Sequence, residues 1–270
     1  MMRFTKMQSC GNDYVYVTAF GKPPAALPKL ARFCSDRHRG IGSDGLIVIC
    51  GSEKCDIRMR VFNPDGTEAE MCGNALRSAA SLARMKGIIC KDDITVETLG
   101  GEKSVRILSL DGGYCIAKSD LGVPEGFKAY EEPVSVRGRK FEISVLSFGN
   151  PHIAAFTAGI DRLNIKKYGP PLEKSGYFPN GANVHFYSVS PGGEIAARSW
   201  ERGCGETLSC ATGAAAAFAA ARARGICGLR AYVRHPGGTL LAESDENGRI
   251  FVTGETRLVF EGELLPEDIV

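Results

Sequence analysis

The sequence has no long hydrophobic run and no strong excess of charge. Its longest aliphatic stretch, GLIVIC at residues 45–50, is far shorter than the roughly 20 residues that span a bilayer. Residues 1–20 carry no apolar segment of the signal-peptide type. The formal charge is only +2, and Lys and Arg form no dense cluster. We therefore expect a cytoplasmic protein that binds a small molecule, and neither a membrane nor a nucleic acid.

The spacing that marks a structural zinc site is also missing. No C-x-x-C pair occurs among the ten cysteines, and the four histidines are scattered along the chain. A chain of 270 residues with 44% hydrophobic residues does not need disulfides to build a core, so we expect reduced thiols. No cofactor-binding motif is found either. The sequence therefore predicts a protein that uses no metal ion and no cofactor such as pyridoxal phosphate.

What the sequence does contain is a long internal repeat. Residues 60–90, RVFNPDGTEAEMCGNALRSAASLARMKGIIC, align without a gap with RSWERGCGETLSCATGAAAAFAAARARGIC, at an offset that places Cys72 on Cys210. Residues 60–88 contain 8 identities with the second copy, where average residue usage would give roughly two. The same offset carries Asn12 onto Asn150. The chain is therefore a duplication that forms two similar domains.

The repeat and the loop-like composition near residues 122–126 set the expected domain boundaries. We expect an N-terminal domain at residues 1–119, joined by the C-terminal segment 258–270, and a second domain at residues 120–257. Successive strands joined by short turns predict an α/β (α+β) fold, in which each domain is a mainly antiparallel sheet or barrel curled around a central helix.

Helical spacing supports this picture in detail. The second central helix, predicted at residues 210–224, has small apolar side chains on nearly every face, which is typical of a buried helix. The first half contains an additional predicted helix at residues 28–38. In the second half, residues 157–183 are rich in loop and turn signals, so we expect them to replace that helix.

Each repeat places a cysteine where its central helix starts. The unpaired N–H groups and the dipole at a helix N-terminus stabilise a thiolate, so we expect a thiol pKa roughly one unit below its usual value of about 8.5. The N–H groups of Gly73 and Asn74, and of Ala211 and Thr212, could also hold a substrate carboxylate. Two such thiols suggest a racemisation, in which one group removes a proton from carbon and another returns one to the opposite face.

Four motifs resemble the signatures of diaminopimelate epimerase, and they lie in order over nearly the whole chain. They are MxxxGNDY near the start, FNPDGTEAEMCGN, GNPH at residues 149–152, and ERGCGETLSCATG. The resemblance implies a cofactor-independent isomerase that interconverts LL- and meso-2,6-diaminopimelate in lysine and peptidoglycan precursor biosynthesis. It also implies that Cys72 and Cys210 are the acid–base pair, with the active site in the cleft between two pseudo-symmetric domains.

The same resemblance implies roles for further residues. His152 would tune the thiol on one side, and Glu201 the thiol on the other. The side chains that bind the amino and carboxylate groups of the substrate would be those of Asn12, Asn63, Asn150, Asn183, Glu201 and Arg202.

This chain departs from the family pattern at four positions. Ala75 and Ala211 stand where glycine is usual, Gly45 where some members have Gln, and His185 where a small or acidic residue is expected. The two alanines keep their N–H groups and should spare the chemistry. Gly45 and His185 bear on how the distal end of the substrate is recognised.

Other readings of these residues stay open at this stage. The chain could be a racemase of another amino acid, including proline, on the same fold, or a non-enzymatic thiol switch in which Cys72 and Cys210 form a disulfide. Asn12 and Asn150 could cap turns, and His152 could be structural. The oligomeric state is undetermined, with a homodimer as one option. Cys10 and Cys204 lie near the motifs without an assigned role, and the remaining cysteines are expected to be structural, namely Cys34, Cys50, Cys55, Cys90, Cys115 and Cys227.

Overall fold

The computed structural model describes residues 2–21, 24 and 26–265, and the chain forms two compact units. The first unit comprises Met1–Ser119 and Gly254–Val270, and the second comprises Asp120–Thr253. The chain returns to the first unit at residue 254 rather than at the expected residue 258, inside the long strand β18 (Ile250–Leu264). Residues 266–270 of the expected C-terminal segment lie outside the described residues.

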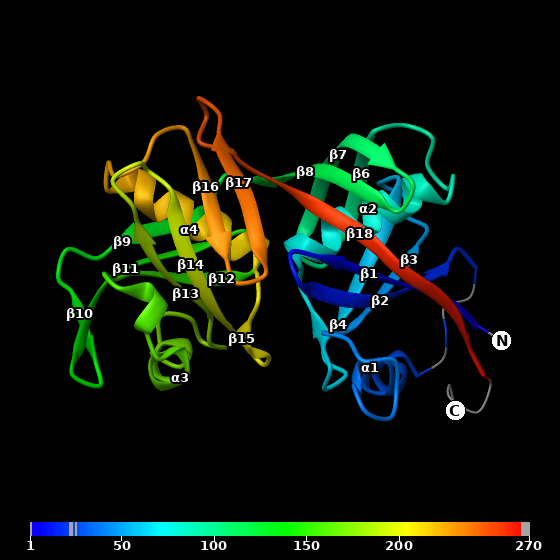
Figure 1. Ribbon diagram of the computed structural model, residues 1–270, viewed down its shortest axis with the longest axis horizontal. Helices are drawn as coiled ribbons and strands as arrows, with labels where there is room; N and C mark the ends of the chain where they lie inside the picture. Colours follow the sequence, from blue (N-terminus) through cyan, green and yellow to red (C-terminus); the bar gives the residue numbers. More distant parts are fainter. Residues whose placement is uncertain (1, 22–23, 25, 266–270) are drawn as a thin grey trace. The chain divides into compact units, whose positions relative to one another are not determined.

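The first unit is a mixed sheet with two helices (Figure 1). Its elements in chain order are β1 (Met2–Ser9), β2 (Asn12–Ala19), α1 (Leu27–Ser35), β3 (Leu46–Cys50), β4 (Ile57–Phe62), β5 (Glu68–Ala69), α2 (Gly73–Met85), β6 (Asp93–Thr98), β7 (Gly101–Asp111) and β8 (Tyr114–Gly122).

The second unit repeats this order. Its elements are β9 (Glu125–Ala129), β10 (Val134–Val136), β11 (Arg139–Ser147), β12 (Pro151–Phe156), η1 (Ile160–Arg162), α3 (Ile165–Glu173), β13 (Asn183–Val189), β14 (Ile195–Glu201), β15 (Gly205–Thr207), α4 (Ala211–Ala223), β16 (Arg230–His235) and β17 (Gly238–Ser244).

Strand direction follows the connections. Strands joined by short turns pair antiparallel, as β1 does with β2 and β16 with β17. Strands separated by a helix pair parallel: β2 with β3 across α1, and β4 with β6 across α2. The second unit has the corresponding parallel pairs β12–β13 and β14–β16. A parallel pair needs a long crossover, which the helix supplies. The predicted α+β class with two similar, mainly antiparallel domains is confirmed.

One strand serves both units. The first residues of β18 pair with β17, whereas its remainder pairs with β1. In the first copy, β8 lies at the position that corresponds to β18 at the repeat offset, and β9, which follows it, pairs with β11. The end of each copy is therefore followed by residues that pair with the first strand of the other copy, through β9 with β11 and through the second part of β18 with β1.

The prediction that residues 157–183 contain no helix is wrong. Helix α3 occupies Ile165–Glu173, at the repeat offset from α1. The Asn164 side chain accepts a hydrogen bond from the Lys167 N–H at 3.0 Å and caps the helix. Two prolines inside the segment, at 170 and 171, obscured the helical pattern.

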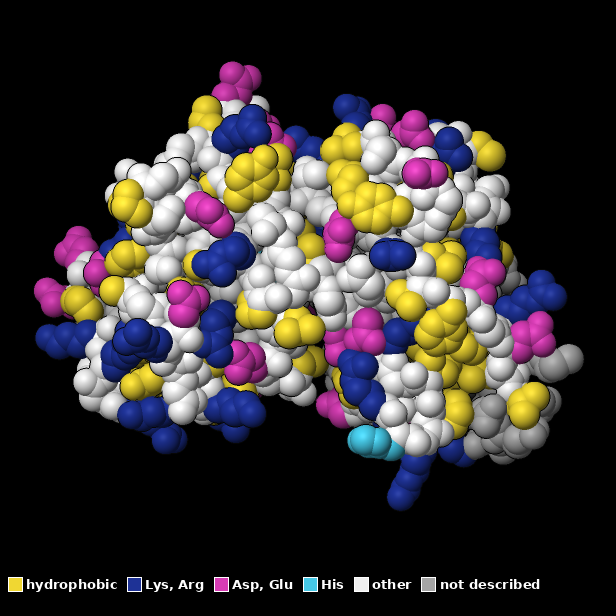
Figure 2. Space-filling model, viewed as in Figure 1, with side chains coloured by type: hydrophobic (Ala, Val, Ile, Leu, Met, Phe, Trp, Pro, Cys, Tyr) yellow, Lys and Arg dark blue, Asp and Glu magenta, His cyan; other side chains and the backbone are white. Residues whose placement is uncertain are grey.

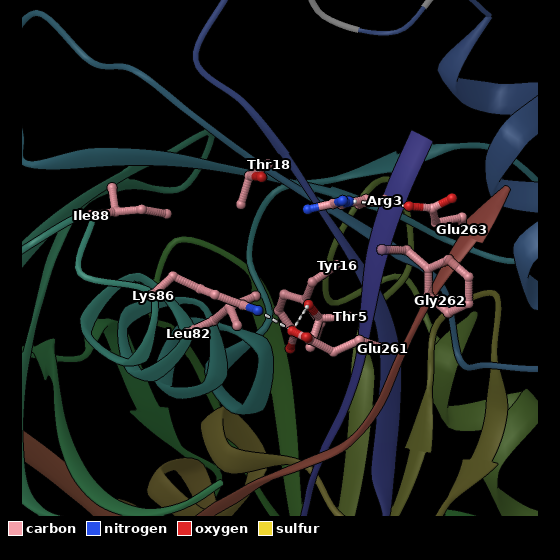
Figure 3. Close-up of a pocket in the computed structure, with 11 residues that line it drawn as sticks. Arg3, Thr5, Tyr16, Thr18, Leu82, Lys86, Ile88, Glu261, Gly262 and Glu263 are labelled. Atoms are coloured by element: carbon pink, nitrogen blue, oxygen red, sulfur yellow. Dashed lines mark hydrogen bonds and ion pairs between the residues drawn. The ribbon is translucent and has the colours of Figure 1, made fainter. Parts of the chain in front are cut away.

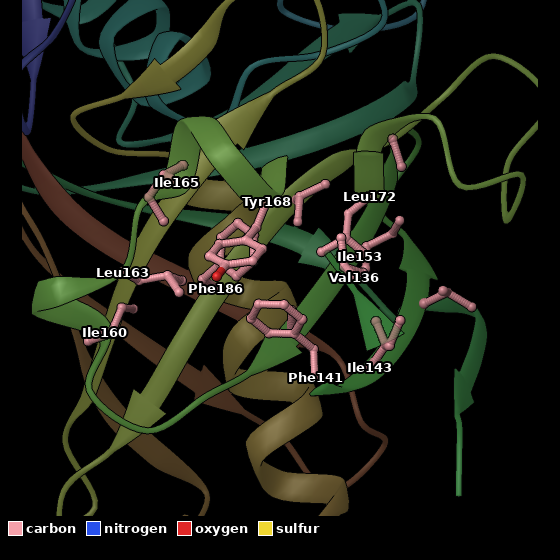
Figure 4. Close-up of a cluster of buried hydrophobic side chains, with 14 residues drawn as sticks. Val136, Phe141, Ile143, Ile153, Ile160, Leu163, Ile165, Tyr168, Leu172 and Phe186 are labelled. Atoms are coloured by element: carbon pink, nitrogen blue, oxygen red, sulfur yellow. The ribbon is translucent and has the colours of Figure 1, made fainter. Parts of the chain in front are cut away.

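Packing explains why this helix forms despite its prolines. Ile165, Tyr168 and Leu172 share one face of α3 and are buried in the core of the second unit. Figure 4 shows these side chains around Phe141 and Phe186. Burial of such an apolar face outweighs poor intrinsic propensity in a short helix.

The central helices α2 and α4 are enclosed by strands. The first eleven residues of each helix are buried, and α4 contacts strands β12, β13, β14, β16 and β17. Most of the buried α4 residues are alanine, which lets the strands approach closely on every side. None of the described helices is both long and apolar enough to cross a membrane.

The surface carries charges of both signs. On the face shown in Figure 2, Lys and Arg side chains alternate with Asp and Glu, and no broad field of one sign forms there. This distribution accords with the nearly balanced composition.

We predict that enlarging a buried α4 side chain destabilises the second unit. Ala216 is fully buried, so Ala216→Leu should lower the free energy of unfolding by roughly 1–3 kcal/mol through overpacking. The control is Ala223→Leu at the exposed last residue of α4, which should change it by less than about 0.5 kcal/mol. Urea denaturation measures both, and equal effects would contradict enclosure of the helix.

Candidate active site

Cys72 and Cys210 occupy equivalent positions in the two units. Each is the residue immediately before its central helix, with φ and ψ of −136° and 116° for Cys72 and −137° and 116° for Cys210. The loop after β5 or β15 leads into each cysteine. The sulfur atoms therefore lie at the ends of the helices where unpaired N–H groups and the dipole favour negative charge.

The hydrogen bonds at Cys210 favour a thiolate. Its sulfur accepts a hydrogen bond from the Gly213 N–H at 3.4 Å, in the manner of a helix cap. The Thr212 hydroxyl lies 3.4 Å from the same sulfur and is free to act as donor. Cys210 is almost completely buried. Donors directed at a sulfur stabilise its deprotonated form.

Cys72 has different partners although its backbone is the same. Its sulfur makes no capping bond to the helix. It lies 3.6 Å from Oδ1 of Asn12, which can only accept, and it accepts from the Tyr14 hydroxyl at 3.5 Å. The Asn12 acceptor favours the protonated thiol, whereas the Tyr14 donor favours the thiolate, so this sulfur has a partner for each protonation state. Sequence reasoning missed Tyr14, although the repeat offset aligns it with His152 and could have pointed to it.

A polar network behind Cys72 orients Asn12. The Asn12 amide donates to Asp44 at 2.7 Å, and its Oδ1 accepts from Nδ2 of Asn74 at 3.4 Å. The guanidinium of Arg77 donates in turn to Oδ1 of Asn74 at 2.6 Å and to Ser9 at 2.9 Å. Arg77 is entirely buried. The sequence analysis overlooked it because the repeat aligns it with Ala215, so the duplication gives no signal there.

A chain of hydrogen bonds through two histidines occupies the second unit. Nε2 of His152 lies 2.9 Å from Oδ1 of Asn150, and its Nδ1 lies 2.9 Å from Nε2 of His185. Nδ1 of His185 lies 2.9 Å from the Ser199 hydroxyl. Both histidines are completely buried. All four members therefore form one connected series, Asn150–His152–His185–Ser199.

His152 and His185 are both neutral at neutral pH. Burial, with a smaller contribution from the charge of Arg202, lowers the pKa of His152 to about 3. Burial also lowers the pKa of His185 well below its usual value, with further contributions from His152 and His235. Since both ring nitrogens of His152 are engaged by Asn150 and His185, its immediate effect in this unit is on the Asn150 amide.

The other expected binding residues are placed by local contacts. Asn183 donates to the Pro151 carbonyl at 3.2 Å and accepts from the Arg202 N–H at 3.0 Å. Glu201, at the end of β14, accepts from the Thr207 hydroxyl. Asn63, which follows β4, donates to the hydroxyl of Thr67 in the next turn at 3.0 Å.

The structure thus divides the expected site residues between the units. The first unit contains Asn12, Asn63, Cys72, Gly73 and Asn74, and the second contains Asn150, His152, Asn183, Glu201, Arg202, Cys210, Ala211 and Thr212. Gly73 and Ala211 are the first helical residues of α2 and α4. Within the described residues, no group of three or more His, Cys, Asp and Glu side chains is arranged to hold a metal ion.

Four further cysteines are buried or half-buried. Burial is the largest influence on the pKa of the Cys10, Cys50, Cys115 and Cys227 thiols and raises each above its usual value. Cys115 also lies within hydrogen-bonding distance of Ser81, at 3.1 Å, in the interior. These thiols are poor nucleophiles near neutral pH.

A pocket of about 450 Å³ lies at the other end of α2 from Cys72 (Figure 3). It is lined by Leu82, Lys86 and Ile88, together with residues of β1, β2 and β18. Lys86 forms an ion pair with Glu261 there, and Thr5 bonds to the same carboxylate. None of the expected site residues lines this pocket, so it is distinct from the chemistry at the cysteines.

The backbone around Gly45 leaves no space for a side chain. A Cβ at this position would lie 2.3 Å from the Phe62 carbonyl oxygen and 2.9 Å from the Tyr14 ring. The φ angle of 153° is also unfavourable for other residues. In this chain, therefore, a glutamine could not simply replace Gly45.

We predict that Gly45→Gln destabilises the first unit instead of adding a substrate contact. The expected loss is roughly 1–3 kcal/mol of unfolding free energy, because the side chain must displace its neighbours. Gly51→Gln is the control, since only Phe20 approaches a Cβ there, at 3.9 Å. Thermal unfolding of both variants measures the difference, and an unchanged Gly45→Gln variant would refute the close approach.

Comparison with known proteins identifies the family. Residues 4–124 and 144–259 match the family model described as diaminopimelate epimerase. The diaminopimelate epimerase of Desulfovibrio desulfuricans is 43% identical, and the match covers 97% of this chain and 98% of that protein. The diaminopimelate epimerase of Acetivibrio thermocellus is 40% identical with the same coverage. The chain belongs to the diaminopimelate epimerase family. It is therefore an enzyme of an amino-acid epimerase family, as the motifs predicted.

Solved structures of more distant proteins share the fold. A predicted epimerase from Pseudomonas aeruginosa superposes with a TM-score of 0.73 at 17% identity, covering 98% of this chain and 99% of that one. A hydroxyproline epimerase from Agrobacterium vitis superposes with a TM-score of 0.72 at 14% identity, covering 99% and 93%. At this level of identity the comparison supports the two-domain fold of the diaminopimelate epimerase family alone.

Proposed function

We propose that this chain interconverts LL- and meso-diaminopimelate, with Cys72 and Cys210 as the two acid–base groups. The observation that carries this proposal is the equivalence of the two cysteines, each at the N-terminus of a buried helix with the same backbone angles. Relatives that carry the name diaminopimelate epimerase at up to 43% identity support the choice of substrate. The reaction would proceed in lysine and peptidoglycan precursor synthesis.

In the proposed reaction the resting enzyme holds one thiolate and one thiol. The donors at Cys210 make it the base that removes the α-proton and becomes a thiol. Cys72, beside the acceptor oxygen of Asn12, is the acid that returns a proton to the opposite face and becomes a thiolate. One proton leaves carbon and another replaces it, so the net charge is unchanged. The reverse reaction exchanges the two roles.

Negative charge spreads onto the substrate carboxylate as the α-carbon loses its proton. Backbone N–H groups at the starts of α2 and α4, from Gly73 and Asn74 and from Ala211 and Thr212, are the donors we propose for it. In other oxyanion sites a single such donor is worth about 2.7–4 kcal/mol. This stabilisation requires no metal ion and no cofactor.

The distal amino-acid head needs its own binding groups. We propose Asn63, Asn150, Asn183 and Arg202 for this role, with Glu201 close to Arg202 in sequence as a partner for an ammonium group. Arg202 can pair with a carboxylate through two parallel hydrogen bonds. Because the mechanism depends on two reduced thiols, we propose a cytoplasmic location.

We predict that Cys72→Ser and Cys210→Ser each abolish epimerisation and leave the fold intact, because a hydroxyl is a far weaker base than a thiolate at neutral pH. The control is Cys90→Ser at an exposed cysteine, which should keep wild-type activity. The measurement is deuterium wash-in at the α-carbon in D2O with LL- and meso-diaminopimelate. Near wild-type turnover in both directions by either single variant would exclude the two-thiol mechanism.

We predict that Arg202→Lys strongly impairs turnover of LL-diaminopimelate, because an ammonium group cannot reproduce the planar fork of a guanidinium. An amino acid with one head, such as lysine or proline, should be disfavoured by several orders of magnitude in kcat/KM, since it leaves buried polar groups unpaired. A panel of amino acids in the wash-in assay measures both. Preference for a one-headed amino acid would instead support a racemase of that substrate.

A further inference from the structure

The hydrogen bonds that connect Asn150, His152, His185 and Ser199 all run in the same direction, from donor to acceptor. Oδ1 of Asn150 can only accept, so Nε2 of His152 carries the proton that bridges them. A neutral imidazole carries a single N–H, which leaves Nδ1 of His152 as an acceptor for the Nε2–H of His185. Nδ1 of His185 then accepts from the Ser199 hydroxyl. The proton positions of the two histidines and the orientation of the Asn150 amide are therefore coupled, so that a change in one requires a change in the others.

This direction determines what Asn150 offers to a ligand. Because Oδ1 of Asn150 is bonded to His152, Nδ2 of Asn150 points away from His152. This Nδ2 group takes part in no hydrogen bond within the described residues. An amide NH2 group is a donor and suits a carboxylate. If His152 carried its proton on Nδ1 instead, the amide would turn over and offer its carbonyl oxygen, which repels a carboxylate.

The equivalent asparagine of the first unit is held in the opposite sense. Nδ2 of Asn12 donates to the carboxylate of Asp44, which can only accept, and Oδ1 faces the sulfur of Cys72. The duplicated asparagines therefore have opposite atoms engaged by the residues behind them: Nδ2 in Asn12 and Oδ1 in Asn150. The difference arises from the residues behind them and not from the asparagines themselves.

Three residues behind Asn150 differ in polarity or size from their counterparts in the first unit. At the repeat offset, His185, Ser199 and Gly213 correspond to Ile47, Val61 and Ala75, which are all buried and apolar. Gly213 is required by His185, because a Cβ there would lie 2.2 Å from the imidazole Nδ1. The first copy shows that the fold accepts an apolar set at these three positions. The polar set is therefore not needed to form the barrel.

We propose that His185 is a positioning residue that fixes the tautomer of His152 and thereby holds the Asn150 amide with its NH2 group directed at a substrate carboxylate. The proposal rests on the proposed epimerase function only for the identity of that carboxylate. It explains why a histidine pair stands in an otherwise apolar interior. Ser199 and Gly213 support His185 by donating to its ring and by making space for it.

The first test reads the tautomers of the wild-type protein. Two-bond correlation spectra of 15N-labelled protein distinguish protonated from bare ring nitrogens. We expect His152 and His185 both to be protonated on Nε2 and bare on Nδ1. The exposed His38 and the buried His235, whose pKa burial lowers to about 4, provide internal references. A proton on Nδ1 of His152 would overturn the proposal.

The second test replaces three residues of the second unit by their apolar counterparts from the first unit. The triple variant His185→Ile, Ser199→Val, Gly213→Ala should fold, because the first unit accepts apolar residues at these positions, but with lower thermal stability, since Nδ1 of the buried His152 loses its partner. We expect KM for LL-diaminopimelate to rise about 10- to 100-fold, the loss of one hydrogen bond to a charged group, with kcat within about threefold, because the contact is equal in ground and transition states.

His185→Gln is the matched rescue variant. A glutamine amide can still donate to His152 and accept from Ser199, so KM should stay within about threefold of wild type. A triple variant with wild-type KM, or His185→Gln as impaired as the triple variant, would contradict the proposal. If the triple variant does not fold, the tautomers measured in the wild-type protein still test the proposal. These outcomes do not test the two-thiol mechanism. Whether or not His185 has this role, the wild-type enzyme would be active and the cysteine variants would be inactive.

Discussion

The structure depends on the burial of a whole helix inside each sheet. Eleven consecutive residues of α2 and of α4 are removed from water, and the last turns end in exposed or half-buried residues. Such a helix exposes none of these residues to water, so its backbone can offer unpaired groups only at its ends. At the N-terminus the backbone N–H groups have no partners within the helix. A cysteine placed there can use those groups, and the surrounding strands supply the remaining polar contacts.

The two copies satisfy this constraint with different polar residues. In the first unit, the buried guanidinium of Arg77 reaches Asn74 and Ser9 beneath the helix start. In the second unit, α4 is almost entirely alanine at the corresponding positions, and the polar contacts come from histidines on β12 and β13. Burial of a charged guanidinium costs more free energy than burial of two neutral imidazoles that are hydrogen-bonded to each other. The sulfur environments differ accordingly, although the backbones coincide.

The sequence revealed the features that repeat and overlooked those that do not. The duplication located both cysteines, the central helices and Asn12 with Asn150, because identical residues at one offset require no knowledge of the third dimension. Helix α3 was missed because Pro170 and Pro171 interrupt its pattern, and only the packing of Tyr168 and Leu172 against the core explains why it forms. Tyr14 bonds to Cys72 and Arg77 bonds to Ser9, both distant in sequence, so no local pattern identifies these contacts.

An epimerase that inverts one centre of diaminopimelate needs symmetry at the α-carbon and asymmetry elsewhere. In the proposed reaction the cysteines exchange acid and base roles between directions, which two equivalent helix ends allow. The distal head is not inverted, so its binding groups gain nothing from duplication. Of the residues proposed for that head, Asn150, Asn183 and Arg202 belong to the second unit and Asn63 alone to the first. The fold accepts Ile47 and Val61 in one copy and His185 and Ser199 in the other, because those positions contribute to the barrel mainly through their volume. In the proposed reaction the chemistry therefore belongs to the cysteines that the copies share, and most of the residues proposed for the distal head, namely Asn63, Asn183 and Arg202, differ from their counterparts in the other copy.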